Sequence, residues 1–296
     1  MTISQLLDKS TKQLNKNKMQ NPLFEAELLL SHVLKKSREY ILAHPEKLLT
    51  KTLISNYHKL INKRLKGIPL AYIVGYKYFY GLKFLVNKNV LIPRPETELM
   101  VDEALKLLHS KKSTTIIDVG TGSGCIIISI ATKMSFGYPK LIFNYFATDI
   151  SKLALEVAKK NAKIHKVNKK ISFRQGNLLE PFLKNKLKID NCKLIIICNL
   201  PYLIPKQLKN SPTIQFEPKL ALSGGQDGLR YYRKLLKQIG RLCNKLYVIG
   251  YMLIEVDPSQ SKEIKKLVKH HLPNSKIQIK KDLRGLNRLV IIRINK

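Results

Sequence analysis

Apolar residues in the later two thirds of the chain form short runs between helical patterns. The run 194–198 is apolar without alternation, which is typical of a central parallel strand buried on both faces. Further strands are expected at 114–119 and 252–255, and helical patterns follow at 126–131 and 153–158. Strands that alternate with helices predict a doubly wound α/β sheet.

The first part of the chain has apolar residues at helical spacing instead. Pro22 can open a helix whose apolar face carries Ala26, Leu29 and Leu30. We therefore expect residues 1–68 to form a helical bundle domain. No catalytic cluster stands there, so the domain is expected to help dock a macromolecular substrate, or only to stabilise the protein.

A connector separates this bundle from the predicted sheet. Residues 69–90 are rich in aromatic and β-branched residues around glycines, which predicts a β-hairpin. In the segment 92–98, two prolines hold the chain extended just before a helix. Arg94 and Glu96 are then held in place as a candidate wall of a site, or as surface charges beside a capped helix. The catalytic domain is expected to span residues 91–296.

The buried strand 194–198 ends abruptly in Asn199-Leu200-Pro201-Tyr202. Ligands of open α/β sheets bind at the carboxyl ends of strands, so these residues are expected in a site. The Asn199 side chain and the Leu200 carbonyl offer two acceptors, Pro201 stiffens the turn, and Tyr202 offers an aromatic face. Together they suit a flat group that bears an amide. Taken alone, a strand-terminating turn with a core aromatic explains them equally well.

A glycine-rich loop follows the strand 114–119. Its spacing is G-x-G-x-G after an aspartate, not the G-x-G-x-x-G of dinucleotide binders. This spacing suits S-adenosylmethionine, which has no phosphate but carries an ammonium group that an acidic side chain can meet. The residues expected to bind this co-substrate here are Asp118, Gly120, Thr121, Gly122, Ser123 and Gly124.

The next two predicted strands also end in candidate ligands. Asp149 stands where an acidic residue binds ribose hydroxyls, and Ser151 already serves as the cap of the following helix. After the third strand, the Asn177 amide is expected to meet the adenine edge while Leu178 packs on its ring. Asn199 is expected to contact the co-substrate as well.

The end of the chain predicts the fold class more narrowly. Segments 276–280 and 288–294 read as strands joined by a short turn, which predicts an antiparallel hairpin at the sheet edge. That ending is typical of class I S-adenosylmethionine-dependent methyltransferases and not of nucleotide dehydrogenases. We therefore expect an α/β, Rossmann-like sheet with a terminal antiparallel hairpin, preceded by the helical bundle.

Composition adds little to this picture. The chain has 296 residues, 44% of them hydrophobic, and no apolar run reaches the length of a membrane span. Its four cysteines (Cys125, Cys192, Cys198, Cys243) form no CxxC pair, so we expect buried thiols, a cytoplasmic protein and no metal site. The net charge of +34 comes from lysines spread along the chain, and it supports an anionic partner such as nucleic acid or the ribosome only weakly.

Several motifs in this order and spacing resemble one known family, the release-factor N(5)-glutamine methyltransferases of the PrmC/HemK type. The glycine loop indicates only a methyltransferase, whereas the PRPETE and EP..AL.GG.DGL segments are specific. The resemblance covers nearly the whole chain and is carried by residues 67–75, 91–98, 118–124, 148–149, 199–202, 217–218, 221–229, 282–283, Gly285 and Arg288.

This resemblance implies methylation of the glutamine in the Gly-Gly-Gln tip of peptide chain release factors, with S-adenosylmethionine as the donor. Asn199 Oδ1 and the Leu200 carbonyl would accept the amide protons of that glutamine, and Tyr202 would support the amide plane. The sequence departs from the family where Leu200 replaces a proline and Asn177 an aspartate, and also at Tyr78 and Asp257. We expect a monomer.

Two other functions use the same residues. Asn-Leu-Pro-Tyr is common in rRNA adenine dimethyltransferases, whose adenine amino group fits the same acceptors, and N6-adenine methylation of rRNA or other nucleic acid agrees with the basic charge. Those enzymes usually carry their extra domain behind the catalytic one. The second alternative is an inactive methyltransferase fold that serves as an RNA-binding scaffold, against which the intact glycine loop and Asp149 speak.

Overall fold

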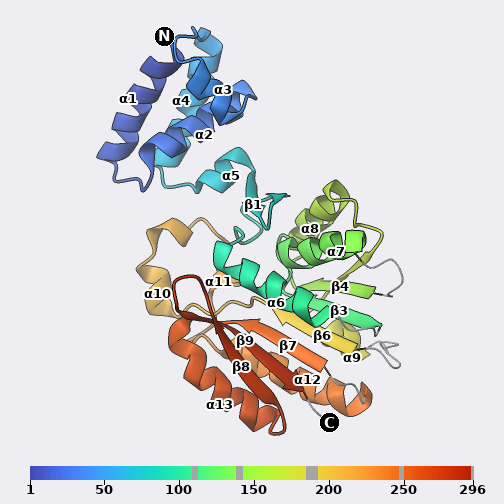
Figure 1. Ribbon diagram of the computed structural model, residues 1–296. Helices are drawn as coiled ribbons and strands as arrows, with labels where there is room; N and C mark the ends of the chain where they lie inside the picture. The colour runs from blue at the N-terminus through green and yellow to red at the C-terminus, as the bar shows by residue number, and fades with distance from the viewer. Residues whose placement is uncertain (109–112, 138–142, 185–192, 247–249, 295–296) are drawn as a thin grey trace. The chain divides into compact units, whose positions relative to one another are not determined.

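The computed structural model describes residues 1–108, 113–137, 143–184, 193–246 and 250–294. The chain divides into two compact units (Figure 1). The first comprises Met1–Tyr76 with Pro212–Phe216, and the second comprises Lys77–Ser211 with Glu217–Lys296. None of the described helices is long and apolar enough to cross a membrane.

The first unit is helical. Pro22 begins α2, as its fixed φ predicts, and Ala26, Leu29 and Leu30 are fully buried on one face of that helix. Tyr57 is buried against them and donates its hydroxyl proton to the Ala26 carbonyl at 3.2 Å. The helices of this unit are α1 (Ile3–Lys16), α2 (Pro22–Leu34), α3 (Arg38–Ala43), α4 (Lys51–Leu65) and α5 (Leu70–Val74).

The expected connector, residues 69–90, is divided between the two units. Helix α5 belongs to the first unit, whose N-terminal stretch runs from Met1 to Tyr76. The expected β-hairpin is present as β1 (Tyr76–Phe79) and β2 (Leu82–Leu85), which turn around Gly81.

A seven-stranded sheet forms the centre of the second unit, in the order β5-β4-β3-β6-β7-β9-β8 (Figure 1). The first five of these strands are parallel neighbours, and β9 pairs antiparallel with both β7 and β8. The predicted central strand and the predicted edge hairpin are therefore confirmed. The strands are β3 (Thr114–Val119), β4 (Phe143–Asp149), β5 (Ile171–Gln175), β6 (Lys193–Cys198), β7 (Gly250–Glu255), β8 (Lys276–Lys281) and β9 (Asn287–Ile294).

Helices cover both faces of this sheet. On one face, Ile116, Ile195 and Ile197 pack with the helices α6, α7 and α8. On the other face, Ile117 and Ile196 pack with α9, α12 and α13. The helices of this unit are α6 (Glu98–Leu108), α7 (Cys125–Gly137), α8 (Lys152–Ile164), α9 (Glu180–Lys184), α10 (Pro205–Lys209), α11 (Lys219–Leu222), α12 (Arg230–Leu246) and α13 (Ser261–His271), with short 3-10 turns at η1 (Pro95–Thr97) and η3 (Pro258–Gln260). A further 3-10 turn, η2 (Pro212–Ile214), belongs to the first unit.

Because helices cover both faces of the sheet, β3 is buried along its whole length and β6 along nearly all of it. Both Cys125 and Cys198 are buried free thiols, as expected. Cys192 and the side chain of Cys243 lie outside the described residues. The buried core fixes the sheet, and the loops at its carboxyl edge are left to form a site.

Candidate active site

A cavity opens at the carboxyl ends of β3, β4, β5 and β6, where the sequence placed a site. It encloses about 1070 Å³ of empty space including its mouth. Most of the predicted site residues line it, namely Arg94, Gly120, Thr121, Gly122, Ser123, Asp149, Asn177, Leu178, Asn199, Leu200 and Pro201. Four predicted residues, Asp118, Gly124, Glu96 and Tyr202, are not among its lining residues.

The glycine loop after β3 wraps one side of the cavity. Gly120, Gly122 and Gly124 have φ angles of 74°, 55° and 81°, a region that residues with a Cβ rarely adopt. Asp149, at the end of β4, accepts the backbone N–H groups of Gly122 and Ser151, each at 2.9 Å. Burial raises the pKa of Asp149 against these hydrogen bonds. The carboxylate therefore shapes the loop as well as facing the cavity.

Asp118 lies beneath this loop and not in the cavity. It is fully buried, and its Oδ2 accepts the hydroxyl proton of Thr121 at 2.7 Å. Burial raises the pKa of Asp118 to about 7, the Thr121 hydrogen bond opposes that shift, and the charge of Asp149 adds to it. Its Oδ1 has no hydrogen-bond partner among the described residues. Asp118 was expected to meet the ligand ammonium group directly or through water, and it does not line the cavity.

The loop after β5 supplies an apolar wall. Leu178 has a positive φ of 58°, is buried, and lines the cavity beside Asn177. Ile150, just after the neighbouring strand β4, also lines the cavity and is 48% exposed. A flat aromatic ring fits between apolar side chains of this kind, while the Asn177 amide offers a donor and an acceptor. These residues and the loop carboxylate fit an adenosyl group.

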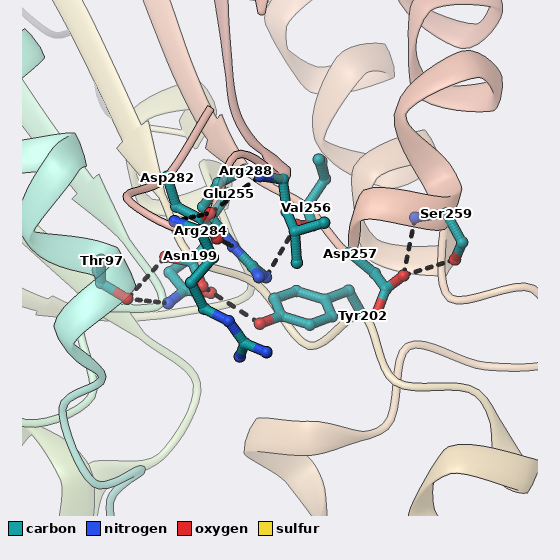
Figure 2. Close-up of polar contacts among 11 residues, drawn as sticks. Thr97, Asn199, Tyr202, Glu255, Val256, Asp257, Ser259, Asp282, Arg284 and Arg288 are labelled. Carbon is teal, nitrogen blue, oxygen red and sulfur yellow. Dashed lines mark hydrogen bonds and ion pairs between the residues drawn. The ribbon is translucent and has the colours of Figure 1, made fainter. Parts of the chain in front are cut away.

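Asn199 stands at the end of β6 and joins a chain of buried polar groups (Figure 2). Its Nδ2 donates to Thr97 Oγ1 at 3.1 Å, and Thr97 donates to Glu255 Oε2 at 2.6 Å. Among the described residues, no donor reaches Asn199 Oδ1. Because Asn199 lines the cavity, its free carbonyl oxygen can accept a proton from a ligand there.

Leu200 and Tyr202 differ in how they face this site. The Leu200 carbonyl lies 3.3 Å from the buried Tyr232 hydroxyl, which also donates to the Glu255 carbonyl at 2.5 Å. Since a carbonyl has two lone pairs, one stays available. Tyr202 directs its hydroxyl to Glu255 Oε1 at 3.2 Å, and burial raises its pKa (Figure 2). The tyrosine therefore supports the polar chain from outside the cavity.

The segment around Gly224 and Gly228 fixes the backbone of this turn. Gly224 donates to the Leu203 carbonyl at 2.9 Å, and Gln260 Nε2 donates to the Tyr202 carbonyl at 2.8 Å. A Cβ on Gly228 would stand 2.2 Å from that same carbonyl oxygen, so only glycine fits. The EP..AL.GG.DGL segment therefore packs against the backbone of the turn that carries Asn199.

Arg94 reaches the same segment from the other side. Its Nη2 pairs with Glu217 Oε1 at 2.5 Å, and Glu217 Oε2 accepts the Ile92 N–H at 3.0 Å. Glu217 is almost fully buried, so the pair ties the PRPETE segment to the residue that opens the EP..AL.GG.DGL segment. Arg94 thus walls the cavity as expected, whereas Glu96 does not line it.

Comparison with known proteins agrees with both parts of the chain. Residues 5–75 match the family model described as PrmC N-terminal domain, and residues 110–285 match one described as methyltransferase domain. The release factor glutamine methyltransferase of Bacillus subtilis (strain 168) is 34% identical over 278 residues, which cover 92% of this chain and 91% of the relative. The chain belongs to the release factor glutamine methyltransferase family. The resemblance found in the motifs is therefore confirmed.

Other relatives in this family show a similar extent of likeness. The release factor glutamine methyltransferase of Aliivibrio fischeri (strain ATCC 700601 / ES114) is 36% identical over 273 residues, covering 92% of this chain and 90% of the relative. Among solved structures, the catalytic domain of hMettl16 in complex with the MAT2A 3'UTR hairpin 6 has a TM-score of 0.54 at 15% identity, and the match covers 73% of this chain and 77% of that chain. At that identity the likeness confirms the methyltransferase fold alone.

Sequence reasoning missed two residues of the site, Thr97 and Glu255. Thr97 lies in the segment 92–98, and Glu255 is the last residue of the strand expected at 252–255. The signal was available for Glu255, because an acidic residue at the end of an apolar strand is the same pattern that identified Asp149. Among the described residues, no cluster of three or more His, Cys, Asp or Glu could hold a metal ion. The absence of a metal cofactor stays a prediction.

Proposed function

We propose that this protein transfers a methyl group from S-adenosyl-L-methionine to the side-chain amide nitrogen of the glutamine in the Gly-Gly-Gln motif of peptide chain release factors. The observation that carries the proposal is the likeness to release factor glutamine methyltransferases along about nine tenths of the chain, both units included. The geometry at Asn199 agrees with a glutamine amide as the methyl acceptor, because Asn199 Oδ1 can accept a hydrogen bond from its NH2 group. The proposed substrate also implies a cytoplasmic reaction.

The co-substrate is proposed to occupy the cavity between the glycine loop and Leu178. When bound, S-adenosylmethionine supplies an electrophilic methyl group on a positively charged sulfur. Gly120–Ser123 would hold its amino-acid part, Asp149 its ribose hydroxyls, and Asn177 with Leu178 its adenine. Each of these residues lines the cavity, so they fit the molecule, whereas Asp118 and Gly124 do not line it.

Asn199 and Leu200 are proposed to bind the substrate amide. An amide nitrogen is a poor nucleophile because its lone pair is delocalised into the carbonyl group. Asn199 Oδ1 and the Leu200 carbonyl would accept hydrogen bonds from its two N–H groups, which aims the nitrogen and raises its electron density. The amide proton can leave to water after transfer, so positioning does most of the work and no general base is assigned.

The first test offers two acceptors to the purified protein with labelled S-adenosylmethionine. One is an unmethylated release factor with its Gln→Ala variant as control, and the other is unmodified rRNA. Label on the wild-type release factor alone is the expected result. Label on rRNA would assign Asn199 to adenine chemistry, and label on neither with no cofactor binding would indicate a scaffold. Weak association with nucleic acid or the ribosome and a monomeric state both stay predictions.

A further inference from the structure

Behind Asn199 lies a polar chain that the proposed reaction does not yet use. Thr97, at the end of η1, and Glu255, at the end of β7, are each only 2% exposed. The Asn199 Nδ2 donates to Thr97 Oγ1 at 3.1 Å, and the Thr97 hydroxyl donates to Glu255 Oε2 at 2.6 Å. Figure 2 shows the three side chains in this sequence.

The chemistry of these groups fixes which way the Asn199 amide faces. An ionised carboxylate only accepts hydrogen bonds, and a threonine hydroxyl has one proton. The Thr97 proton is therefore used by Glu255, and Thr97 offers a lone pair to Asn199. A lone pair accepts from the NH2 end of the amide. A reversed amide would set Oδ1 against Thr97 Oγ1, two acceptors with no proton between them.

Several neighbours oppose the effect of burial on the Glu255 carboxyl. Burial raises the pKa of this carboxyl, while the Thr97 hydrogen bond, the charge of Arg288 and the Tyr202 hydrogen bond all favour the ionised form. Tyr202 donates to Oε1 at 3.2 Å, so both carboxylate oxygens are engaged. Arg288 is itself fixed by Asp282 Oδ2 at 3.1 Å and by the Val256 carbonyl at 3.4 Å (Figure 2).

We propose that Thr97 and Glu255 are positioning residues that hold the Asn199 amide with Nδ2 bonded to Thr97 and Oδ1 left to accept a hydrogen bond from a ligand in the cavity. The inference rests on the proposed function, because only a substrate with amide protons needs an acceptor there. An asparagine that rotates freely would present its NH2 group to the substrate half of the time, and that group repels another NH2. The Thr97 hydroxyl and the Glu255 carboxylate thus select the reactive orientation through the Asn199 amide.

Two substitutions at Thr97 separate this role from packing. Thr97→Ser keeps the hydroxyl and loses a methyl group, whereas Thr97→Val keeps the shape and loses the hydroxyl. We expect Thr97→Val to lower kcat for release-factor methylation by roughly 10- to 100-fold, the range typical of supporting residues, with kcat of Thr97→Ser within about 3-fold of wild type. The Kd for S-adenosylhomocysteine is expected to stay unchanged in both. Equal kcat values for the two variants would overturn the proposal.

A third substitution reverses the proton order itself. In Glu255→Gln the new amide can donate to Thr97 Oγ1, which frees the Thr97 proton to point at Asn199 and favours the reversed amide. We expect this variant to lose kcat to the same degree as Thr97→Val while its melting temperature stays close to that of Thr97→Ser. A loss of kcat that follows melting temperature across the three variants would mean a structural role only.

A spectroscopic measurement keeps this inference separate from the proposed substrate. In ¹⁵N-labelled protein, the side-chain NH2 signals of Asn199 can be assigned by their absence in Asn199→Asp. The proposal predicts that one Asn199 NH2 proton is held in a hydrogen bond to Thr97 in wild type and in Thr97→Ser. In Thr97→Val the same signal is expected to shift and to lose its protection from exchange. If wild type methylates no release factor, the proposed function fails, yet these signals still decide the orientation. Identical signals in all three proteins would overturn it.

Discussion

The carboxylate of Asp149 accepts the backbone N–H of Gly122 at 2.9 Å and so ties the end of β4 to the glycine loop after β3. Its other oxygen accepts the N–H of Ser151, also at 2.9 Å, at the start of α8. Sequence reasoning assigned Asp149 to ribose hydroxyls alone. In the structure the same carboxylate also holds the loop at Gly122, which has a positive φ of 55°.

Substitution of Asp149 by Asn should therefore weaken cofactor binding through two losses. An amide can replace only one of the two acceptor oxygens and carries no charge. Since a hydrogen bond to a charged group contributes about 1.5–3 kcal/mol, the Kd for S-adenosylhomocysteine should rise by roughly 10- to 150-fold. Titration calorimetry measures it, with the exposed Glu156→Gln on α8 as the control. An unchanged Kd in Asp149→Asn would remove this residue from the site.

Removal of the Asn199 amide should affect turnover far more than cofactor binding. Its Oδ1 has no protein donor among the described residues and faces the cavity, so its contribution is realised with the substrate. We expect Asn199→Ala to lower kcat by roughly 10²–10³-fold, as the loss of a preorganised polar group does, with little change in the Kd for S-adenosylhomocysteine. Asn168→Ala, at an exposed position outside the cavity, serves as control. Equal losses in kcat and affinity would contradict the assigned role.

A side chain at Gly228 should disrupt the turn that carries Asn199. An added Cβ would stand 2.0 Å from Gln260 Nε2 and 2.2 Å from the Tyr202 carbonyl oxygen. Gly285 is the matched control, since its φ of 77° is close to the 74° of Gly228 but its Cβ would meet nothing within 4 Å. We expect Gly285→Ala to lower the free energy of unfolding by about 1–2 kcal/mol, and Gly228→Ala by roughly 1–3 kcal/mol more. Urea denaturation compares them, and equal losses would mean that the close contact is relieved at no cost.

The buried Asp118 should make the free energy of unfolding depend on pH. Burial raises the pKa of its carboxyl from 3.8 to about 7. Between these values the folded state binds more protons than the unfolded state, so the contribution of this group falls as pH rises, by at most about 1.4 kcal/mol per pH unit. Asp118→Asn cannot ionise and should gain stability relative to wild type between about pH 4 and pH 7. Parallel pH dependences of the two proteins would show that Asp118 does not titrate in this range.

The sequence predicted the sheet well because its signals are local. A strand buried on both faces has to be apolar throughout, and β6 is buried along nearly its whole length. Each candidate at a strand end was also placed correctly at the carboxyl edge, since parallel strands bring their ends together. The positions of Asn199, Asp149 and Leu178 followed from this rule.

The direction in which each side chain points could not be predicted from local sequence patterns. Asp118 and Tyr202 stand in the expected segments, but the first is covered by its own loop and the second turns to Glu255. Thr97 meets Glu255 across 158 positions of sequence, and no local pattern signals a pair so distant. Such contacts depend on how the loops pack, which is a property of the whole fold.

Mass spectrometry of the methylated substrate tests the central claim most directly. A purified, unmethylated release factor is incubated with this protein and S-adenosylmethionine, digested, and fragmented to locate the modification. The account predicts one added methyl group on the side chain of the glutamine in the Gly-Gly-Gln peptide, absent when Asn199→Ala replaces the wild-type protein. A methyl group on another residue, or an unmodified peptide from an enzyme that binds the cofactor, would contradict it.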